Sequence, residues 1–196
     1  MTVKTRNLLA IIMLWSLAGF AMAHEGADHA GGFSSGFMHP LLGWDHVLAM
    51  VAVGLWGAFL GGAAMWTLPI VFPFVMAIGG VLGIAGVPLP AVETGIALSA
   101  LVLGCMVLGA VRPPLWLAAV IVGVFAIFHG HAHGTELPEA VSPLAYSVGF
   151  VLATGLLHLC GIGFGFLVRW PAGRAAVRLG GGLIALGGAA FLLGLA

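Results

Sequence analysis

An apolar run begins after His39 and reads HPLLGWDHVLAMVAVGLWGAFL over residues 39–60. A helix needs about 20 mostly apolar residues to cross the hydrocarbon core of a bilayer, and Leu41–Leu60 meets this length. Asp45 and His46 interrupt the run early, where a buried carboxylate is costly unless it finds a partner. The run therefore predicts a membrane-spanning helix that carries polar groups with a role of their own.

The composition agrees with a chain that lives in a membrane. Of its 196 residues, 62% are hydrophobic and 6% are charged, and the formal net charge is zero. Soluble domains contain roughly 45–50% apolar and about 25% charged residues, so an ordinary soluble enzyme and a disordered chain are excluded. Nucleic-acid binding needs clustered Lys and Arg, and Lys4 is the single lysine. The eight histidines outnumber the six basic residues and the six acidic residues taken separately.

Six apolar segments follow one another, which predicts an all-α polytopic membrane protein, a six-transmembrane-helix bundle. Pro69 and Pro73 predict a kink or break in the second segment, and the spacing Gly79-x-x-x-Gly83 predicts close helix packing. The fourth segment is short but can extend into the histidines that follow it. The segments are Leu41–Leu60, Trp66–Ala85, Ala91–Val111, Leu115–Phe128, Pro143–Val168 and Ala175–Leu195.

Residues 1–23 have the three parts of a secretory signal peptide. Lys4 and Arg6 precede an apolar core, and Ala21-Met22-Ala23 forms an A-x-A cleavage site. Cleavage would leave residues 24–196 as a single six-helix transmembrane domain. The alternative is a short first transmembrane helix that stays attached.

The positive charges orient the predicted bundle. With the mature N-terminus outside, every arginine of the mature chain falls in a cytoplasmic loop, in agreement with the positive-inside rule. This predicts a multi-pass protein of the bacterial inner membrane with a periplasmic N-terminus. The arginines are Arg112, Arg169, Arg174 and Arg178.

His39, Asp45 and His46 form a first cluster of candidate metal ligands. The two histidines are seven residues apart and share a helical face, with Asp45 on its flank. Two imidazoles and a carboxylate suit a borderline divalent metal. The alternative is a satisfied polar cluster that only holds helices together.

His129, His133 and Glu136 form a second cluster. If the fourth helix continues past Phe128, the two histidines face the same way at i and i+4, although nearby glycines could equally end the helix. The topology brings this cluster, the first cluster and Glu93 to the same outer side of the membrane. We therefore expect a shared metal site there.

Two further histidines have open interpretations. After cleavage, the α-amine and imidazole of His24 could chelate one ion, or the leader could be a flexible surface segment. His158 lies deep in the fifth segment, where it could be a relay ligand or an ordinary core histidine bonded to a backbone carbonyl.

The stretch HPLLGWDHVLAM over His39–Met50 resembles the signature of the HupE/UreJ family of hydrogenase and urease accessory proteins. FHGHAHGTE over Phe128–Glu136 resembles the second motif of that family, roughly FHGxAHGxE. The signal peptide, the histidine-containing leader and the six segments match as well, so the resemblance covers the whole mature chain. It implies functional roles for both clusters. His131 stands at the variable position of the second motif. The positions carried over are His39, Asp45, His46, His129, His133 and Glu136.

The resemblance implies a permease rather than an enzyme. The family is regarded as importing nickel, and in some members cobalt or another divalent metal. We expect import of Ni²⁺ or Co²⁺, with Cu²⁺ or Zn²⁺ as alternatives, no prosthetic group, and metal-delivery proteins of hydrogenase or urease maturation as partners. The sequence has no Walker motif, so no nucleotide is expected. The alternatives are an intramembrane metal-dependent hydrolase or oxidase and a metal-binding accessory protein that does not transport.

Overall fold

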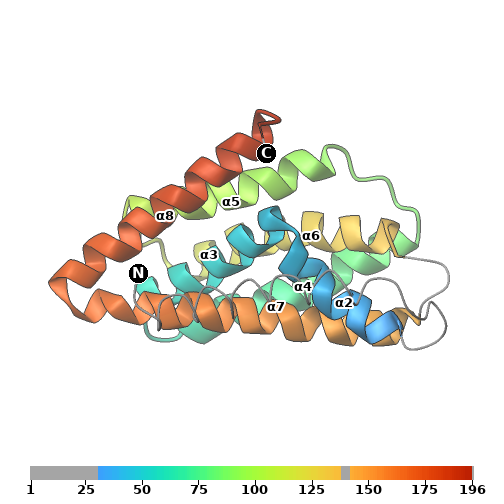
Figure 1. The fold of residues 1–196 in the computed structure, drawn as a ribbon, viewed down its shortest axis with the longest axis horizontal. Helices are drawn as coiled ribbons and strands as arrows, with labels where there is room; N and C mark the ends of the chain where they lie inside the picture. The colour runs from blue at the N-terminus through green and yellow to red at the C-terminus, as the bar shows by residue number, and fades with distance from the viewer. Residues whose placement is uncertain (1–30, 138–141, 196) are drawn as a thin grey trace, which may run out of the picture. The chain divides into compact units, whose positions relative to one another are not determined.

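The computed structural model describes residues 31–137 and 142–195, and every regular element within these ranges is helical (Figure 1). The all-α prediction is therefore confirmed. The predicted signal peptide and the candidate ligand His24 lie outside the described residues. The elements are α2 (Gly31–Leu42), α3 (Trp44–Leu60), α4 (Ala64–Ile84), α5 (Val92–Leu108), α6 (Leu115–Thr135), α7 (Pro143–Gly165), the 3-10 helix η1 (Phe166–Arg169) and α8 (Pro171–Leu192).

Four helices are long and apolar enough to cross a membrane, by length and composition: α4, α6, α8, and α7 continued by η1. The pair α2 and α3 is a fifth candidate, although the two helices meet at an angle of 80°. α5 is apolar but has 17 residues, fewer than the ~20 of a typical span. The described helices thus identify a membrane protein with four or five such candidates, and the arrangement of six spans stays a prediction.

The first predicted segment, Leu41–Leu60, is not one straight helix. α2 ends at Leu42, and α3 begins at Trp44 after Gly43, whose backbone is extended (φ −87°, ψ 110°). A Cβ on Gly43 would lie 2.9 Å from Asp45 Oδ1 and 3.0 Å from His46 Nδ1. The prediction of an uninterrupted helix was wrong here because the glycine leaves room for two polar side chains to fold back over the chain.

The two prolines of α4 do not break the helix, which runs from Ala64 to Ile84. The structure therefore shows no break in α4, and the kink stays a prediction. A proline inside a helix has no backbone N–H to donate to the carbonyl four residues earlier. Pro73 thus leaves the carbonyl of Pro69 without its usual helical donor.

Glycines allow close approach between α4 and α6 and between α3 and α7. An added Cβ on Gly79 or Gly83 of α4 would overlap the carbonyl of Ile127 or His131 in α6. Gly161 of α7 faces the backbone of α3 in the same way. The close packing predicted from the glycine spacing is confirmed, and it fixes the histidine-bearing end of α6 against α4.

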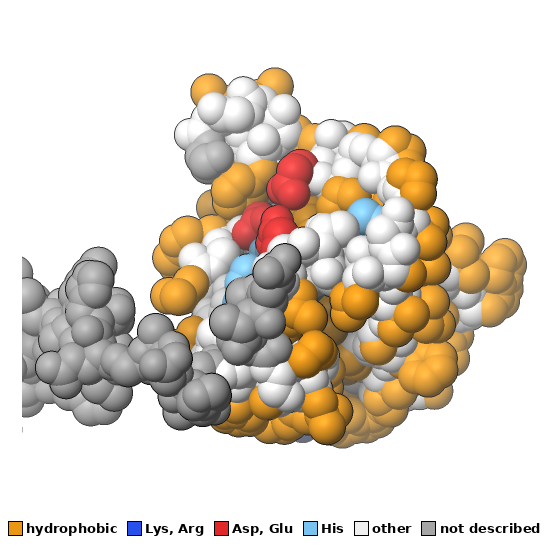
Figure 2. All heavy atoms as spheres, turned by 90° about the vertical axis from the view of Figure 1, so that its right-hand side faces the viewer, with side chains coloured by type: hydrophobic (Ala, Val, Ile, Leu, Met, Phe, Trp, Pro, Cys, Tyr) orange, Lys and Arg blue, Asp and Glu red, His pale blue; other side chains and the backbone are white. Residues whose placement is uncertain are grey.

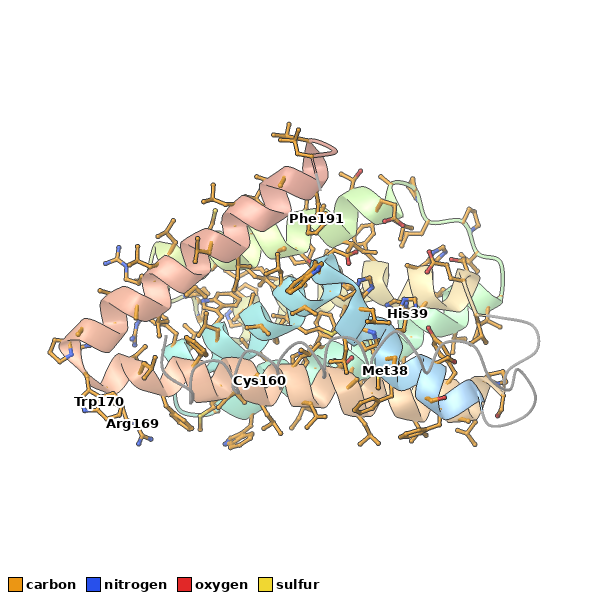
Figure 3. All side chains as sticks on the ribbon, viewed as in Figure 1. Met38, His39, Cys160, Arg169, Trp170 and Phe191 are labelled. Carbon is orange, nitrogen blue, oxygen red and sulfur yellow. The ribbon has the colours of Figure 1, made fainter. Side chains whose placement is uncertain are left out.

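The arginines gather at one end of the bundle. The Arg178 side chain donates a 2.8 Å hydrogen bond from Nε to the Leu108 carbonyl at the end of α5. The Arg112 guanidinium lies 4.7 Å from the centre of the Phe59 ring near the end of α3. Figure 3 shows Arg169 at the end of the bundle away from His39. The fold thus gives the bundle one basic end, as the orientation by positive charge requires.

Candidate metal centre

The bend at Gly43 brings together three histidines from three helices. His39 lies in the last turn of α2, His46 in the first turn of α3, and His133 in the last turn of α6. One ring nitrogen of each lies within 4.8 Å of those of the other two. His46 and His133 are buried and His39 is half-buried. We call His39, His46 and His133 the histidine cluster.

The spacing of these nitrogens suits one cation. His46 Nε2 and His133 Nε2 are 2.8 Å apart, and the ring centroids of His39 and His133 are 4.8 Å apart. Metal–imidazole bonds are about 2.1 Å long, so two nitrogens that bind one ion at a right angle lie about 3 Å apart. The cluster therefore needs only small movements to place three imidazole nitrogens on one divalent ion.

Asp45 lies against His46 rather than among the three nitrogens. Its Oδ1 is 2.8 Å from His46 Nδ1. When Nδ1–H donates to this carboxylate, the neutral imidazole presents the lone pair of Nε2 to the cluster. A carboxylate that holds the far nitrogen of a ligating histidine fixes its tautomer and makes it a better donor. In this geometry Asp45 holds the ring of a candidate ligand, and the direct ligation expected from the sequence stays a prediction.

A polar cavity of about 330 Å³ opens beside the cluster. Its polar side chains are His39, His46, Asp45, Glu93 and Glu136. The three carboxylates are all the acidic residues that the described ranges contain. Figure 2 shows acidic side chains gathered with histidine on this face of the protein. A cavity lined by one sign of charge raises the local concentration of the opposite ion, so this acidic cavity would attract cations to the cluster.

His129 lies one helical turn deeper than His133 on the same face of α6. The residue is fully buried, and its ring centroid is 5.3 Å from that of His46. Its Nδ1 pairs with the Phe125 carbonyl at 3.0 Å, whereas Nε2 has no hydrogen-bond partner in the described part of the chain. His129 therefore stands behind the histidine cluster with one nitrogen free.

His131 points away from the cluster. Its Nε2 is 2.7 Å from the carbonyl of Val87, in the loop that leads into α5. This contact ties α6 to the segment just before Glu93. The structure thus separates His131 from its neighbours His129 and His133, since it faces a loop rather than the cavity.

Two aromatic residues of α7 complete the surroundings of the cluster, and the sequence analysis did not identify them. The Phe150 ring centroid is 4.2 Å from that of His133, and the Tyr146 centroid is 6.2 Å from that of His39. Both are buried. Aromatic residues inside an apolar run give no signal of their own, because such positions usually pack against other apolar side chains.

Comparisons with known proteins identify the family of the chain. A sequence profile described as HupE / UreJ protein matches residues 12–191. The chain is 47% identical over 191 residues to Protein HupE of Rhizobium leguminosarum bv. viciae, covering 97% of this chain and 100% of that protein. No solved structure gives a significant match. The profile match and the full-length relative together show that the chain belongs to the HupE/UreJ family.

Proposed function

We propose that the chain is a permease that imports Ni²⁺ or Co²⁺ through the bacterial inner membrane for hydrogenase or urease maturation. The observation that carries this proposal is the histidine cluster beside an acidic cavity, at the end of the bundle away from the described arginines. Family membership supports a role in handling metal for those enzymes. It also supports an accessory and transport role rather than catalysis.

The cavity and the cluster would act in sequence on a hydrated ion. The carboxylates of Asp45, Glu93 and Glu136 attract the divalent cation. The imidazoles of the cluster then replace water molecules, since nitrogen donors bind Ni²⁺ and Co²⁺ more tightly than water does. Conduction also requires that the ion can leave, so a half-buried ligand such as His39 suits exchange better than a closed site would.

The proposed orientation places this end in the periplasm. Six spans and a cleaved signal peptide would put the mature N-terminus on the same side, and the arginine end in the cytoplasm. The amine and imidazole of His24 would then be available as an additional capture site. Metal-delivery proteins would receive the ion at the arginine end.

The test is uptake of Ni²⁺ or Co²⁺ into proteoliposomes that contain the purified full-length chain. We expect His46→Ala and His133→Ala to abolish uptake while the protein still inserts. His131→Ala is the matched control, because His131 is an equally buried histidine two residues from His133 that faces Val87 instead. It should retain most of the uptake.

The same assay separates the alternatives. Wild-type protein that binds metal in detergent but moves none across a sealed membrane would be an accessory metal-binding protein. Uptake that survives the loss of both His46 and His133 would show that the histidine cluster is not the route.

A further inference from the structure

The interior of the bundle contains a second group of polar atoms well below the histidine cluster. His158 of α7 is buried, at 1% exposure, and both of its ring nitrogens lack a hydrogen bond of good geometry within the described ranges. At 1.5 Å per residue it lies about 22 Å along the helix from Pro143. Leaving a buried polar group unsatisfied costs about 1–3 kcal/mol, so a protein retains such a group when something else uses it.

A backbone oxygen faces the same ring. The Pro69 carbonyl of α4 makes a weak hydrogen-bonding contact with the His158 ring, and both residues line one groove of about 450 Å³ between α4 and α7. Pro73 removes the N–H that would otherwise occupy this carbonyl. An imidazole and a carbonyl oxygen that no helical N–H uses are therefore presented together in an otherwise apolar groove.

The Thr154 hydroxyl of α7, four residues before His158, is a third polar group that could bind a cation. Thr154 is one turn before His158 and is fully buried, and its Oγ1 has no partner among residues 31–137 and 142–195. Residues at i and i+4 share a helix face. A threonine in a helix commonly bonds to the carbonyl four residues back, and this one does not.

Ring contacts connect this group to the histidine cluster. The His46 and His129 centroids are 5.3 Å apart, and the Phe72 centroid lies 5.3 Å from that of His129 and 5.4 Å from that of His158. Four helices, α3, α6, α4 and α7, thus contribute one ring each to a continuous buried row. This row of rings links the histidine cluster to His158.

We propose that His158 and the carbonyl of Pro69, with the Thr154 hydroxyl, form an inner binding station for the transported divalent cation. This inference rests on the proposed function for its direction of travel, but the station itself is a metal site that can be tested by binding. It assigns a use to the second proline of α4, which keeps the Pro69 carbonyl free of the helix.

The first experiment exchanges prolines within α4. Pro73→Ala supplies the N–H that can bond the Pro69 carbonyl, whereas Pro69→Ala leaves the carbonyl at position 69 free and serves as the matched control. Initial Ni²⁺ uptake by proteoliposomes should fall at least tenfold in Pro73→Ala and less than threefold in Pro69→Ala. Equal rates in the two variants would overturn the role of the carbonyl.

The second experiment removes the imidazole and the hydroxyl. His158→Leu should lower uptake at least tenfold, and Thr154→Val at least threefold. In both variants, Co²⁺ binding at the histidine cluster should stay within twofold of wild type. Ser99→Ala is the control, because Ser99 is buried but its hydroxyl already bonds the Ile96 carbonyl. Wild-type uptake by His158→Leu, or loss of cluster binding together with uptake, would overturn the station.

A binding measurement tests the inference without transport, and a second substitution of His158 covers the case in which His158→Leu does not fold. In a His46→Ala, His133→Ala background, millimolar Co²⁺ should still show nitrogen ligation by absorption spectroscopy, and adding His158→Leu or His158→Gln should reduce this signal, the remainder coming from other histidines such as His24. If wild type takes up no metal, the proposed permease function fails while this measurement still decides on the station. Unchanged Co²⁺ spectra without His158 would refute it.

Discussion

Asp45 reaches the histidine cluster through His46. Its carboxylate is bonded to Nδ1 of that ring at 2.8 Å, and it also lines the acidic cavity. One side chain thus combines two effects, attraction of a cation and control of the His46 tautomer. The cost of half-burying the carboxylate is offset by this hydrogen bond and, when metal is present, by the cation.

We expect Asp45→Asn to weaken metal binding roughly 10–100-fold, the usual effect of removing a carboxylate that orients a ligating histidine. The amide keeps the shape, so insertion and folding should be retained. Isothermal titration of purified protein with Ni²⁺ measures the affinity, and size-exclusion chromatography checks the fold. Wild-type affinity in Asp45→Asn would contradict the orienting role.

Glu93 and Glu136 are exposed at the cavity and make no ion pair with another described residue. Exposed charges change association rates and salt dependence more than they change affinity. Glu93→Gln and Glu136→Gln should therefore slow initial uptake at low ionic strength. At high salt, the variants and the wild type should take up metal at the same rate. Uptake measured at two salt concentrations gives the answer. A deficit that is equal at both would make these residues direct ligands instead.

Pairs of closely packed helices hold the site together. α6 carries His129 and His133, and its position is set by glycines that let α4 approach it. The sequence left open whether Gly130 and Gly134 end α6. The helix continues to Thr135, and both glycines lie against the backbone of α4. A Cβ on Gly130 would overlap the carbonyl of Met76.

Gly130→Ala should therefore destabilise the protein by about 1–3 kcal/mol, the range for overpacking a tight interface, and should displace the histidines of α6. Gly163→Ala in α7 is the control, because nothing in the described part of the chain lies within 4 Å of its added Cβ. That change should be neutral or stabilise by up to ~1 kcal/mol. Thermal unfolding in one detergent compares the two variants. Equal melting temperatures would contradict the packing argument.

The sequence predicted helices, glycine contacts and the common end of the two ligand clusters from periodicity and charge alone. It did not predict the break at Gly43, because glycine is tolerated inside helices and the packing of Asp45 and His46 around it is a tertiary effect. For the same reason it did not predict the hydrogen bond between Asp45 and His46. Nor could the spacing of apolar residues distinguish Phe150, which contacts His133, from any other core aromatic.

Within the described residues, charge is divided between the two ends of the bundle. The described carboxylates line one cavity, and Arg112 contacts Phe59 near the end of α3. α3 therefore runs from the cavity to the arginine end. A re-entrant α2–α3 pair would return to the side where it started, so this contact favours α3 as a full crossing despite its 17 residues.

Cysteine labelling can test whether α3 crosses the membrane. Ala63, between α3 and α4, and Thr94, in the first turn of α5, are exposed at opposite ends of the bundle. In a background without Cys105 and Cys160, Ala63→Cys should react with a membrane-impermeant maleimide only from the cytoplasm. Thr94→Cys should react only from the periplasm, because the positive-inside rule puts the arginine end in the cytoplasm and Thr94 lies at the opposite end. Labelling of intact spheroplasts and of inverted vesicles separates the two sides. Periplasmic labelling of Ala63→Cys would make α2 and α3 a re-entrant pair, and would place the end of α3 on the same side as the acidic cavity.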